Sequence, residues 1–386
     1  MTERVCLGLG LLAAACLAGC GGGQADTGTA VARELTGLRY LSADDSGRDG
    51  DGFARALEPR PFSFPADHGA HPGFRTEWWY FTGNVLDARG RHYGFELTLF
   101  RVALTPAQPA RASALAADTV WMGHLAVTDT ARGRFQAAER LSRGAAGIAG
   151  AGPRAAGGPL VVRVEDWSVT IAGERARLEA ADEGFGIALE LAGLDRIVRQ
   201  GDDGLDPKGP EPGNASYYYS APRLAVTGEI VSAGADAVAV EGSAWMDREW
   251  STSALAPGLA GWDWFALQLD DGRDLMFYRL RTDDGGTSPF SGGSITSAAG
   301  EVTRLDAGAV GLRVSREWTS RTTGVRYPVA WQMTVPSLGL ELAIEPRLDD
   351  QELELSVRYW EGAVEVAGEA GGRPVRGVGY LELAGY

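Results

Sequence analysis

Short runs of β-branched and aromatic residues, separated by turn residues, fill the chain from about residue 56 to its end. Almost no stretch shows the 3.6-residue periodicity of an amphipathic helix, so the pattern predicts an all-β fold. The clearest hairpin has strands at 76–86 and 92–101, joined by the turn Asp87-Ala88-Arg89-Gly90. Its return strand places Tyr93, Phe95, Leu97 and Leu99 on one face, which we expect to lie against a core.

Two further hairpins are expected at 123–135 and 262–278. The first and last hairpins are alike, because Glu77-Trp78-Trp79-Tyr80 and Asp263-Trp264-Phe265 each begin an aromatic strand. Their return strands end in Phe100-Arg101 and in Tyr278-Arg279. This correspondence predicts an internal duplication, in which each copy closes into an antiparallel barrel of about eight strands.

The length of 386 residues is sufficient for two hydrophobic cores, since single cores stop growing near roughly 250 to 300 residues. We place an N-terminal domain at 56–235 and a C-terminal domain at 236–386, with the boundary after a strand expected at 224–231. Glycine-rich segments at 144–158 and 200–214 are predicted to be long loops.

The N-terminal segment 1–19 has the layout of a secretory signal peptide, with Arg4 followed by a short apolar run. The run is shorter than the roughly 18 residues that a transmembrane helix needs. It leads into Leu17-Ala18-Gly19-Cys20, a lipobox in which Cys20 would be acylated and become the first residue. Residues 20–55 are rich in Gly, Ala, Asp and Ser and are expected to form a flexible tether. These features predict a lipid-anchored protein at the periplasmic face of the outer membrane.

The net charge of −15 argues against nucleic acid as a partner, because the phosphates would be repelled. Cys6 and Cys16 lie in the segment that processing would remove, so the mature chain would have neither a disulfide nor a cysteine nucleophile. The sequence has no phosphate-binding loop, dinucleotide motif or Gly-x-Ser-x-Gly elbow, and no cofactor is expected.

Aromatic and acidic residues cluster in six segments of the chain. They are Phe64-Pro65-Ala66-Asp67-His68-Gly69, Thr76-Glu77-Trp78-Trp79-Tyr80-Phe81-Thr82-Gly83, Trp245-Met246-Asp247-Arg248-Glu249-Trp250, Trp262-Asp263-Trp264-Phe265, Tyr359-Trp360-Glu361-Gly362-Ala363 and Gly379-Tyr380-Leu381-Glu382-Leu383-Ala384-Gly385-Tyr386. Together they resemble the family of carotenoid 1,2-hydratases (hydroxyneurosporene synthases) and AttH-like proteins. The resemblance implies two lipocalin-like β-barrels in tandem. It also implies either hydration of the isoprenoid ends of carotenoids or the hydrolase and carrier roles of secreted members, with an ABC-type exporter as a partner of AttH-like proteins.

Hydration of an isolated alkene needs a strong acid, surroundings that tolerate a cation, and a delivered water. A carboxylic acid among tryptophans meets the first two needs, because apolar surroundings raise its pKa and aromatic faces stabilise the cation. The candidate acids are Asp247, Glu249 and Asp263, with Asp247 ranked first. Strand alternation predicts that Asp247 and Glu249 form a carboxylate pair pointing into a barrel, whereas Asp263 points away from Trp262 and Trp264.

Aromatic side chains near these acids, and one histidine, are the candidates for binding an apolar ligand. They are Trp78, Trp79, Tyr80, Trp245, Trp250, Trp262, Trp264, Tyr278 and His68. A structural role is the alternative for residues 77–80, since lipocalin-like barrels close one end with a Trp packed under an Arg, and Arg376 is the candidate partner. For Asp67-His68 the alternative is a loop that caps the barrel mouth.

His68 and His71 with Glu77 are a weak candidate for a metal site, because their spacing lacks the helical arrangement of zinc hydrolases, and no metal is predicted. Two functions remain open. The favoured one is a lipid-anchored protein that binds a long apolar ligand, such as a lipid or isoprenoid, in one barrel. The alternative is a hydratase-like or hydrolase-like enzyme, which needs in addition an acid with a raised pKa facing that cavity. In both, the partners are an apolar small molecule or lipid, and the membrane through Cys20.

Overall fold

The computed structural model describes residues 52–106, 117–153, 155, 157–253 and 255–386. The predicted signal peptide, the lipobox with Cys20 and nearly all of the predicted tether lie outside these residues. In the described part of the chain, no helix combines the length and the apolar character that crossing a membrane requires.

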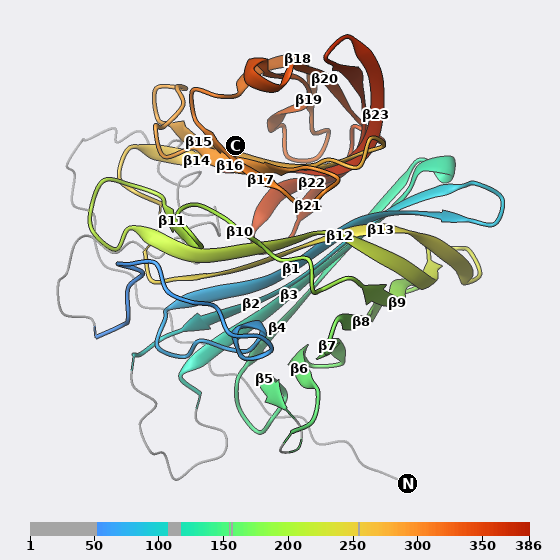
Figure 1. Ribbon diagram of the computed structural model, residues 1–386. Helices are drawn as coiled ribbons and strands as arrows, with labels where there is room; N and C mark the ends of the chain where they lie inside the picture. The colour runs from blue at the N-terminus through green and yellow to red at the C-terminus, as the bar shows by residue number, and fades with distance from the viewer. Residues whose placement is uncertain (1–51, 107–116, 154, 156, 254) are drawn as a thin grey trace, which may run out of the picture. The chain divides into compact units, whose positions relative to one another are not determined.

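The described residues form two antiparallel sheets, which Figure 1 shows one above the other. The first sheet has the strand order β4-β3-β2-β1-β13-β12-β9-β8-β7-β6-β5, and β10 and β11 pair with β12. Its strands are β1 (Thr76–Asp87), β2 (His92–Ala103), β3 (Thr119–Asp129), β4 (Arg134–Arg143), β5 (Ala149–Pro153), β6 (Leu160–Val164), β7 (Trp167–Ala172), β8 (Arg175–Asp182), β9 (Phe185–Ala192), β10 (Val198–Arg199), β11 (Leu205–Pro207), β12 (Ala215–Val231) and β13 (Val238–Ser251).

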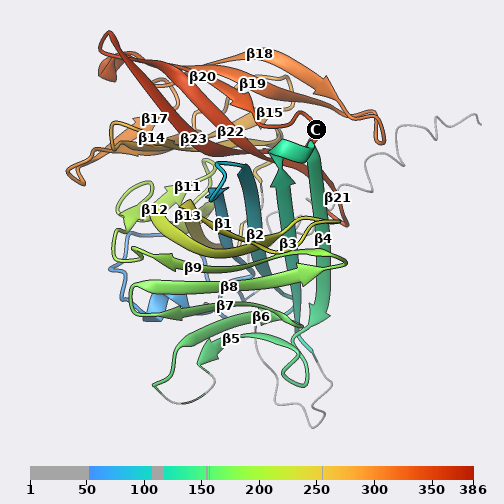
Figure 2. The same cartoon turned by 90° about the vertical axis from the view of Figure 1, so that its right-hand side faces the viewer.

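The second sheet has the order β17-β16-β15-β14-β23-β22-β20-β19-β18, and β21 pairs with β22. Its strands are β14 (Leu259–Leu269), β15 (Asp274–Thr282), β16 (Gly292–Thr296), β17 (Val302–Asp306), β18 (Gly311–Thr319), β19 (Arg326–Val335), β20 (Leu340–Pro346), β21 (Glu352–Glu354), β22 (Arg358–Ala370) and β23 (Arg373–Ala384). Three short 3-10 helices complete the described elements, at η1 (Ala66–His68), η2 (Thr130–Arg132) and η3 (Pro336–Leu338). The predicted all-β fold of two lipocalin-like barrels is confirmed, since each sheet curls around a core of its own (Figure 2).

Strand alternation places the large side chains of each sheet in its core. In β2, Tyr93, Phe95, Leu97 and Leu99 are buried together in the first core, which confirms the face predicted for this hairpin. The first core also contains fully buried tryptophans from β1, β7 and β13, and the second core contains two from β19 and β22. Both cores are therefore filled with large aromatic side chains.

Both glycine-rich segments predicted as loops contain short strands. Residues 149–153 form β5, which pairs with β6 at the edge of the first sheet, and residues 205–207 form β11. The loop prediction was wrong at these points, because an edge strand needs only backbone hydrogen bonds to its neighbour and no large side chains. The chain passes from the first sheet to the second between Ser251 and Leu259, later than the domain boundary predicted near residue 235.

The two sheets repeat one arrangement around their first strands. β1 pairs with β2 and with the last strand of its sheet, β13, as β14 pairs with β15 and β23. Glu77 lies opposite Arg101 in the first sheet, and Asp263 lies opposite Arg279 in the second. The acid and arginine positions that suggested a duplication are thus cross-strand pairs in both sheets.

The faces of the two sheets that point away from their cores pack against each other. The side chain of Asn84 donates a hydrogen bond to the carbonyl of Gly379 (3.0 Å), and Thr128 donates to the side chain of Gln351 (2.8 Å). Two further apolar clusters, distinct from both cores, lie between the sheets. The central strands are therefore covered on both faces.

Gly94 allows the closest approach between β2 and β22. A Cβ atom at this position would lie 2.5 Å from the Cβ of Ala363. We expect Gly94→Ala to lower the free energy of unfolding by about 1 to 3 kcal/mol, because overpacking displaces the backbone. Denaturant unfolding measures this, with Gly150→Ala as the control, since nothing lies within 4 Å of a Cβ there. Equal stability of the two variants would contradict this packing.

Candidate active site

A pocket lies between the two sheets, on the faces that point away from their cores. It offers about 140 Å³ to the centre of a water molecule, whereas a site for one water needs roughly 10 to 15 Å³ by the same measure. Its walls are mainly aromatic, with several acidic groups and one lysine. The lining residues include Trp78, Tyr80, Phe100, Lys208, Tyr218, Asp247, Glu249, Trp262, Trp264, Tyr278, Tyr359, Glu361 and Glu382. The ligand site was predicted inside one barrel, whereas this pocket lies between the two.

Most of the predicted ligand-binding aromatics meet at this pocket. Trp78 and Tyr80 come from β1, Trp262 and Trp264 from β14, and Tyr278 from β15. Trp245 stands directly behind the wall and packs edge-on against Trp264, with ring centroids 6.3 Å apart. The structure therefore brings together six of the nine predicted side chains.

Trp79, Trp250 and His68 do not line this pocket. They lie on the other face of the first sheet, with Trp79 and Trp250 fully buried in its core. Trp79 donates a hydrogen bond to the carbonyl of His68 (2.7 Å), so the loop that contains η1 closes this end of the sheet. The His68 imidazole is itself buried against the hydroxyl of Tyr219 (2.7 Å). These three predicted ligand-binding side chains therefore pack in the first core and in the loop that closes it, away from the pocket.

Asp247 is buried in the wall of the pocket and is surrounded by hydrogen-bond donors. Ser220 and the indole of Trp245 donate to Oδ1 at 2.5 and 2.7 Å, and the hydroxyl of Tyr218 donates to Oδ2. Burial raises the pKa of Asp247 to about 7, even though these three hydrogen bonds oppose the shift. The carboxyl group therefore changes its protonation state near neutral pH.

Glu249 lies two residues further along β13 and shares the pocket face with Asp247. The two carboxyl groups share a face, as alternation along the strand requires. They point out of the first barrel and not into it, because Trp250 and Arg248 occupy the other face of the strand. Lys208 lies 3.7 Å from Glu249 and forms a closer ion pair with Asp206 (2.6 Å). Burial raises the pKa of Glu249, and the charge of Lys208 partly offsets this effect.

Lys208 occupies a second polar corner of the pocket. Its ammonium lies 3.7 Å from the ring centroid of Tyr278, whose hydroxyl donates to Asp206 (2.9 Å). Although burial opposes the charged form, Asp206 and Glu249 raise the pKa of Lys208. A permanent cation with aromatic and acidic neighbours therefore lies beside Glu249.

Glu361 and Glu382 line the opposite wall and face each other across β22 and β23. Burial raises the pKa of Glu382 to about 8 and that of Glu361 well above its usual range. Trp262 donates to Glu382 (2.9 Å), and Tyr80 donates to Oε2 of Glu361 (3.0 Å). Oε1 of Glu361 has no hydrogen-bond partner in the described residues. Burial therefore favours the protonated form of both carboxyls, which can donate a hydrogen bond to a ligand.

We expect Glu361→Gln to raise the melting temperature at pH 8 by about 2 to 6 °C. Because the folded-state pKa of Glu361 lies above its unfolded value, this carboxyl destabilises the protein increasingly as pH rises past about 4.5. The gain should therefore disappear near pH 4. Thermal unfolding at both pH values measures this, with Glu369→Gln, at an exposed position on the same strand, as the control. A gain of equal size at both pH values would rule out this cause.

Asp263 lies on the core side of the second sheet, away from the pocket. It accepts hydrogen bonds from Arg279 (2.6 Å) and from the hydroxyl of Tyr386 (2.5 Å), and Arg281 lies 3.4 Å away. Burial raises its pKa, although both arginines oppose the shift. Alternation along β14 explains this position, because Trp262 and Trp264 take the pocket face. Asp263 is therefore not an acid of this site.

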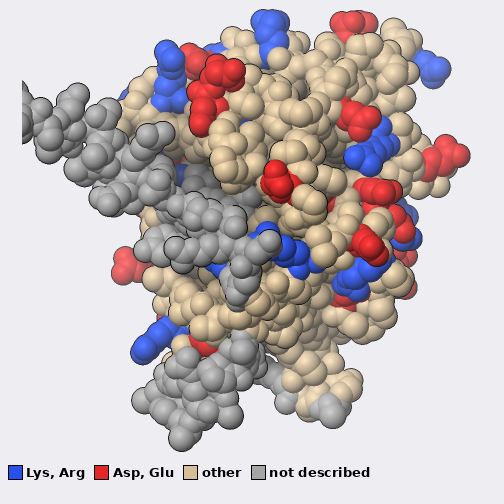
Figure 3. Space-filling model, turned by 90° about the vertical axis from the view of Figure 1, so that its left-hand side faces the viewer, with Lys and Arg blue, Asp and Glu red and all other residues tan. Residues whose placement is uncertain are grey.

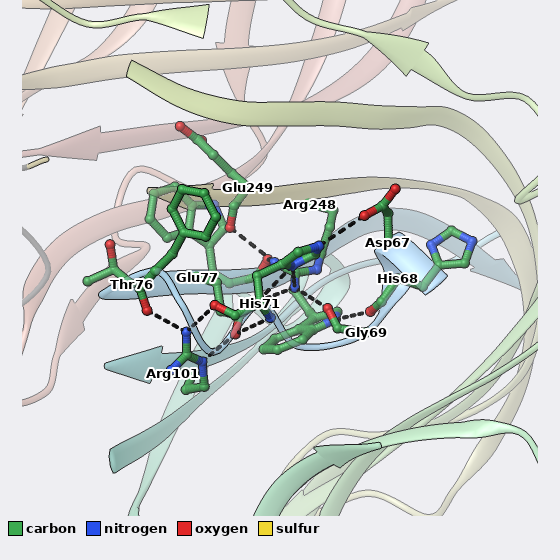
Figure 4. A network of polar contacts seen from close by, with 12 residues as sticks. Asp67, His68, Gly69, His71, Thr76, Glu77, Arg101, Arg248 and Glu249 are labelled. Atoms are coloured by element: carbon green, nitrogen blue, oxygen red, sulfur yellow. Dashed lines mark hydrogen bonds and ion pairs between the residues drawn. The ribbon is translucent and has the colours of Figure 1, made fainter. Parts of the chain in front are cut away.

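Glu77 has the equivalent position in the first sheet and is the centre of a buried network (Figure 4). Arg101 and Arg248 both form ion pairs with it, and the backbone amide of His71 donates to it at 3.0 Å. The guanidinium of Arg248 stacks 3.9 Å from the ring centroid of Trp79. The predicted Trp–Arg closure is therefore present, but it uses Arg248.

Arg376, the arginine proposed for that closure, is exposed on β23 in the second sheet. The last strand of the first sheet is β13, which supplies Arg248 instead. Among the described residues, no group of three or more His, Cys, Asp or Glu side chains is placed to hold a metal ion. The ring nitrogens of His71 instead form hydrogen bonds with the carboxyl groups of Asp67 (3.1 Å) and Glu77 (3.3 Å).

Several site residues were not predicted from the sequence. Glu361 and Glu382 fall in segments that carried the family resemblance, and each is an acidic residue flanked by apolar or aromatic ones, a signal that could have identified them. Lys208 and Asp206 lie in a segment predicted to be a loop, where charged residues are ordinary. Their position follows only from β11, which pairs with β12 beside Tyr218.

The face of the molecule in Figure 3 has acidic and basic side chains interspersed among larger uncharged areas. The described part of this face shows no broad basic area of the kind that tracks a phosphate backbone.

Comparison with known proteins gives three findings. A protein of Nitrosomonas europaea designated AttH has a solved structure that is 34% identical to the chain, with a TM-score of 0.75 over 86% of this chain and 100% of that one. Kievitone hydratase from Nectria haematococca shares the fold with a TM-score of 0.61 at 14% identity, over 86% of this chain and 98% of that one. The dehydratase AsqC of Emericella nidulans is 26% identical over 147 residues, which are 36% of this chain and span only 41% of the dehydratase.

A family model described as AttH-like matches residues 55–386, nearly the whole of the described part of the chain. This match confirms the resemblance that the aromatic and acidic segments indicated. The chain belongs to the AttH-like family.

Proposed function

We propose that this protein is an enzyme that adds water to, or removes water from, an apolar substrate bound between its two sheets. The observation that carries the proposal is Asp247, a buried carboxyl in an aromatic pocket whose pKa is raised to about 7. A general acid is most effective when its pKa lies near the working pH, because it is then both protonated and a ready donor.

In the dehydration direction, Asp247 gives its proton to the departing hydroxyl group, and the carbon–oxygen bond breaks to release water. A neighbouring carbon–hydrogen bond breaks at the same time or afterwards. A second group of the pocket accepts its proton, and its electron pair forms the new double bond. Hydration is the reverse, with Asp247 accepting the proton of the attacking water. The tryptophans around the pocket stabilise positive charge on the substrate by roughly 0.5 to 2 kcal/mol each.

The relatives support this class of reaction. One is named a dehydratase and another a hydratase, the two directions of one chemistry. The first matches only part of its own length and the second shares only the fold, so the substrate is inferred from the pocket. Its aromatic walls favour a long apolar molecule such as an isoprenoid or lipid, with polar groups at Lys208 and Glu361.

A direct test uses a panel of apolar alkenes and β-hydroxy ketones incubated with the protein in ¹⁸O-labelled water. We expect mass spectrometry to detect a change of one water, or incorporation of ¹⁸O, for at least one compound with the wild-type protein and not with Asp247→Asn. Equal turnover by the variant would remove Asp247 from the mechanism. Binding of the panel compounds without any turnover would instead favour a carrier.

A carrier of apolar ligands is the second candidate, and the aromatic lining of the pocket favours it equally. It does not explain why the pocket contains Asp247, Glu361 and Glu382, three buried carboxyls whose raised pKa values destabilise the fold at neutral pH. Native mass spectrometry after purification from the periplasm distinguishes the two, since a carrier should retain a lipid or isoprenoid in stoichiometric amount.

We further propose that Cys20 is acylated and holds the protein at the periplasmic face of the outer membrane, with an apolar molecule and components of an ABC-type exporter as partners. The lipobox at 17–20 supports this placement. Fractionation should find the wild-type protein with the membranes and Cys20→Ser in the soluble periplasm. Recovery of both in the same fraction would contradict the anchor.

A further inference from the structure

Tyr359, His124 and Glu139 form a hydrogen-bonded chain that leads from the pocket toward the outside of the protein. Tyr359 lines the pocket, and its hydroxyl lies 2.5 Å from Nδ1 of His124. Nε2 of His124 lies 3.1 Å from Oε1 of Glu139. The three residues come from β22, β3 and β4, so both sheets contribute to the chain.

The surroundings of these residues set the direction of the hydrogen bonds. Burial raises the pKa of Tyr359, which therefore keeps its proton and donates to Nδ1. Burial also lowers the pKa of His124, so its ring is neutral and Nε2 carries the hydrogen donated to Glu139. Hydrogen bonds from His124 and Ser356 lower the pKa of Glu139, although burial opposes this. The resting chain is thus a neutral tyrosine, a neutral histidine and a carboxylate.

This arrangement resembles an acid–histidine–nucleophile triad, in which a carboxylate orients the imidazole and stabilises it when it becomes charged. Here the group that faces the pocket is a phenol. The carboxylate end is half-buried at 19% exposure, whereas His124 is fully buried. Protons can therefore leave or enter at the Glu139 end, which lies on the opposite side of His124 from the pocket.

We infer that Tyr359, His124 and Glu139 are a proton-transfer triad that supplies the second acid–base group of the reaction, opposite in role to Asp247. In dehydration, the oxygen of Tyr359 takes the proton from the substrate carbon as its own proton passes to Nδ1 of His124. The electron pair of that carbon–hydrogen bond forms the double bond. The site is then left with an imidazolium at His124 and a carboxylate at Asp247, and transfer of one proton through solvent restores both.

The other tyrosines of the pocket lack such a partner. Tyr80, Tyr218 and Tyr278 donate to the carboxyl groups of Glu361, Asp247 and Asp206. An acidic partner holds the tyrosine proton in place and raises the pKa of the phenol, whereas a neutral imidazole can accept it. Among the described residues that line the pocket, Tyr359 is the tyrosine whose hydroxyl is hydrogen bonded to an imidazole and not to a carboxyl group.

This inference depends on the proposed function for its place in the reaction, but its test needs no substrate. An aryl sulfonyl fluoride reacts with a tyrosine when the phenol oxygen attacks sulfur and fluoride leaves, and the reaction requires a base for the phenol proton. We expect p-toluenesulfonyl fluoride to modify Tyr359 of the full-length protein about tenfold or more faster than Tyr80, as measured by peptide mass spectrometry.

His124→Gln should slow the labelling of Tyr359 by about tenfold or more and leave that of Tyr80 unchanged. Because His124 is fully buried and its variant is at risk of misfolding, Glu139→Gln at the half-buried end is the second variant, with a smaller loss expected. Equal labelling of the two tyrosines, or a rate at Tyr359 that neither variant changes, would overturn the triad. Failure of the proposed water chemistry would appear separately, as activated Tyr359 without turnover of the panel compounds.

Discussion

Asp247→Asn should lower kcat for the addition or removal of water by about 10²- to 10⁴-fold, the range typical for loss of a general acid. Asparagine has nearly the same shape and can still accept hydrogen bonds from Ser220 and Trp245, so the pocket should keep its form. We therefore expect the Kd of a fluorescent apolar probe to change by less than about threefold. Stopped assays with a panel substrate and probe titrations measure the two effects, with Asp202→Asn at an exposed position as the control.

The same substitution should stabilise the protein. The folded-state pKa of Asp247 is about 7 and its unfolded value is 3.8, so the carboxyl destabilises the fold increasingly between these two pH values and fully above the higher one. We expect Asp247→Asn to gain about 1 to 3 kcal/mol of unfolding free energy at pH 8 and none near pH 3.5. A variant that is both less active and less stable at pH 8 would point to a structural role for Asp247.

Arg248→Met should be the most destabilising single change, with a loss of about 3 to 5 kcal/mol. Arg248 is fully buried, forms an ion pair with Glu77 and donates to the carbonyls of Trp78 (3.2 Å) and Gly69 (2.6 Å). Methionine fills part of the space but cannot pair with a carboxylate. Of the two arginines that form ion pairs with Glu77, Arg101 alone would remain. Urea unfolding measures the loss, with Arg376→Met as the control because this arginine is exposed.

The double variant Glu77→Gln with Arg248→Met separates the cost of the unpaired carboxylate from the loss of packing. If the unpaired charge dominates, the double variant should be more stable than Arg248→Met alone. Additive losses would show that Arg248 acts mainly through its stacking on Trp79 and its backbone contacts. A loss below about 1 kcal/mol for Arg248→Met would contradict the closure of the first barrel by this residue.

The sequence predicted the strands well where alternation and turn residues agree. The hairpin at 76–101 was predicted to within two residues, and the rule of alternation correctly separated Asp263 from Trp262 and Trp264. Glu77 and Asp263, which were predicted to have equivalent positions in the two halves, each form an ion pair with the arginine opposite on the next strand. These features depend on the alternation of side chains along a strand and on pairing between neighbouring strands, and both can be inferred from the sequence.

The side of the sheet that forms the pocket could not be predicted from the sequence. In β1, β2 and β14, both faces are covered, one by a core and the other by the opposite sheet, so nearly every residue is buried. A strand that is apolar on both faces gives no signal of which face is the core. For this reason Asp247 and Glu249 were correctly predicted to share a face, but that face was predicted to point into a barrel and instead lies between the two sheets.

The residues that complete the site come from segments far apart in the chain. Lys208 reaches the pocket because β11 pairs with β12, and Tyr359 meets His124 only where the two sheets pack together. Such contacts depend on tertiary structure and leave no periodic pattern. In the triad, His124 and Tyr359 are more than 200 positions apart in the chain. No spacing in the sequence therefore indicates that the two side chains meet.

The proposed chemistry requires Asp247 to carry a proton near neutral pH inside an aromatic pocket. Infrared spectroscopy of the carboxylic C=O stretch, recorded as the difference between the wild-type protein and Asp247→Asn over a pH series, tests it most directly. We expect a protonated-carboxyl band that belongs to Asp247 at about pH 6 and disappears with a midpoint near 7. Absence of that band at about pH 6, with Asp247 already ionised, would contradict the account.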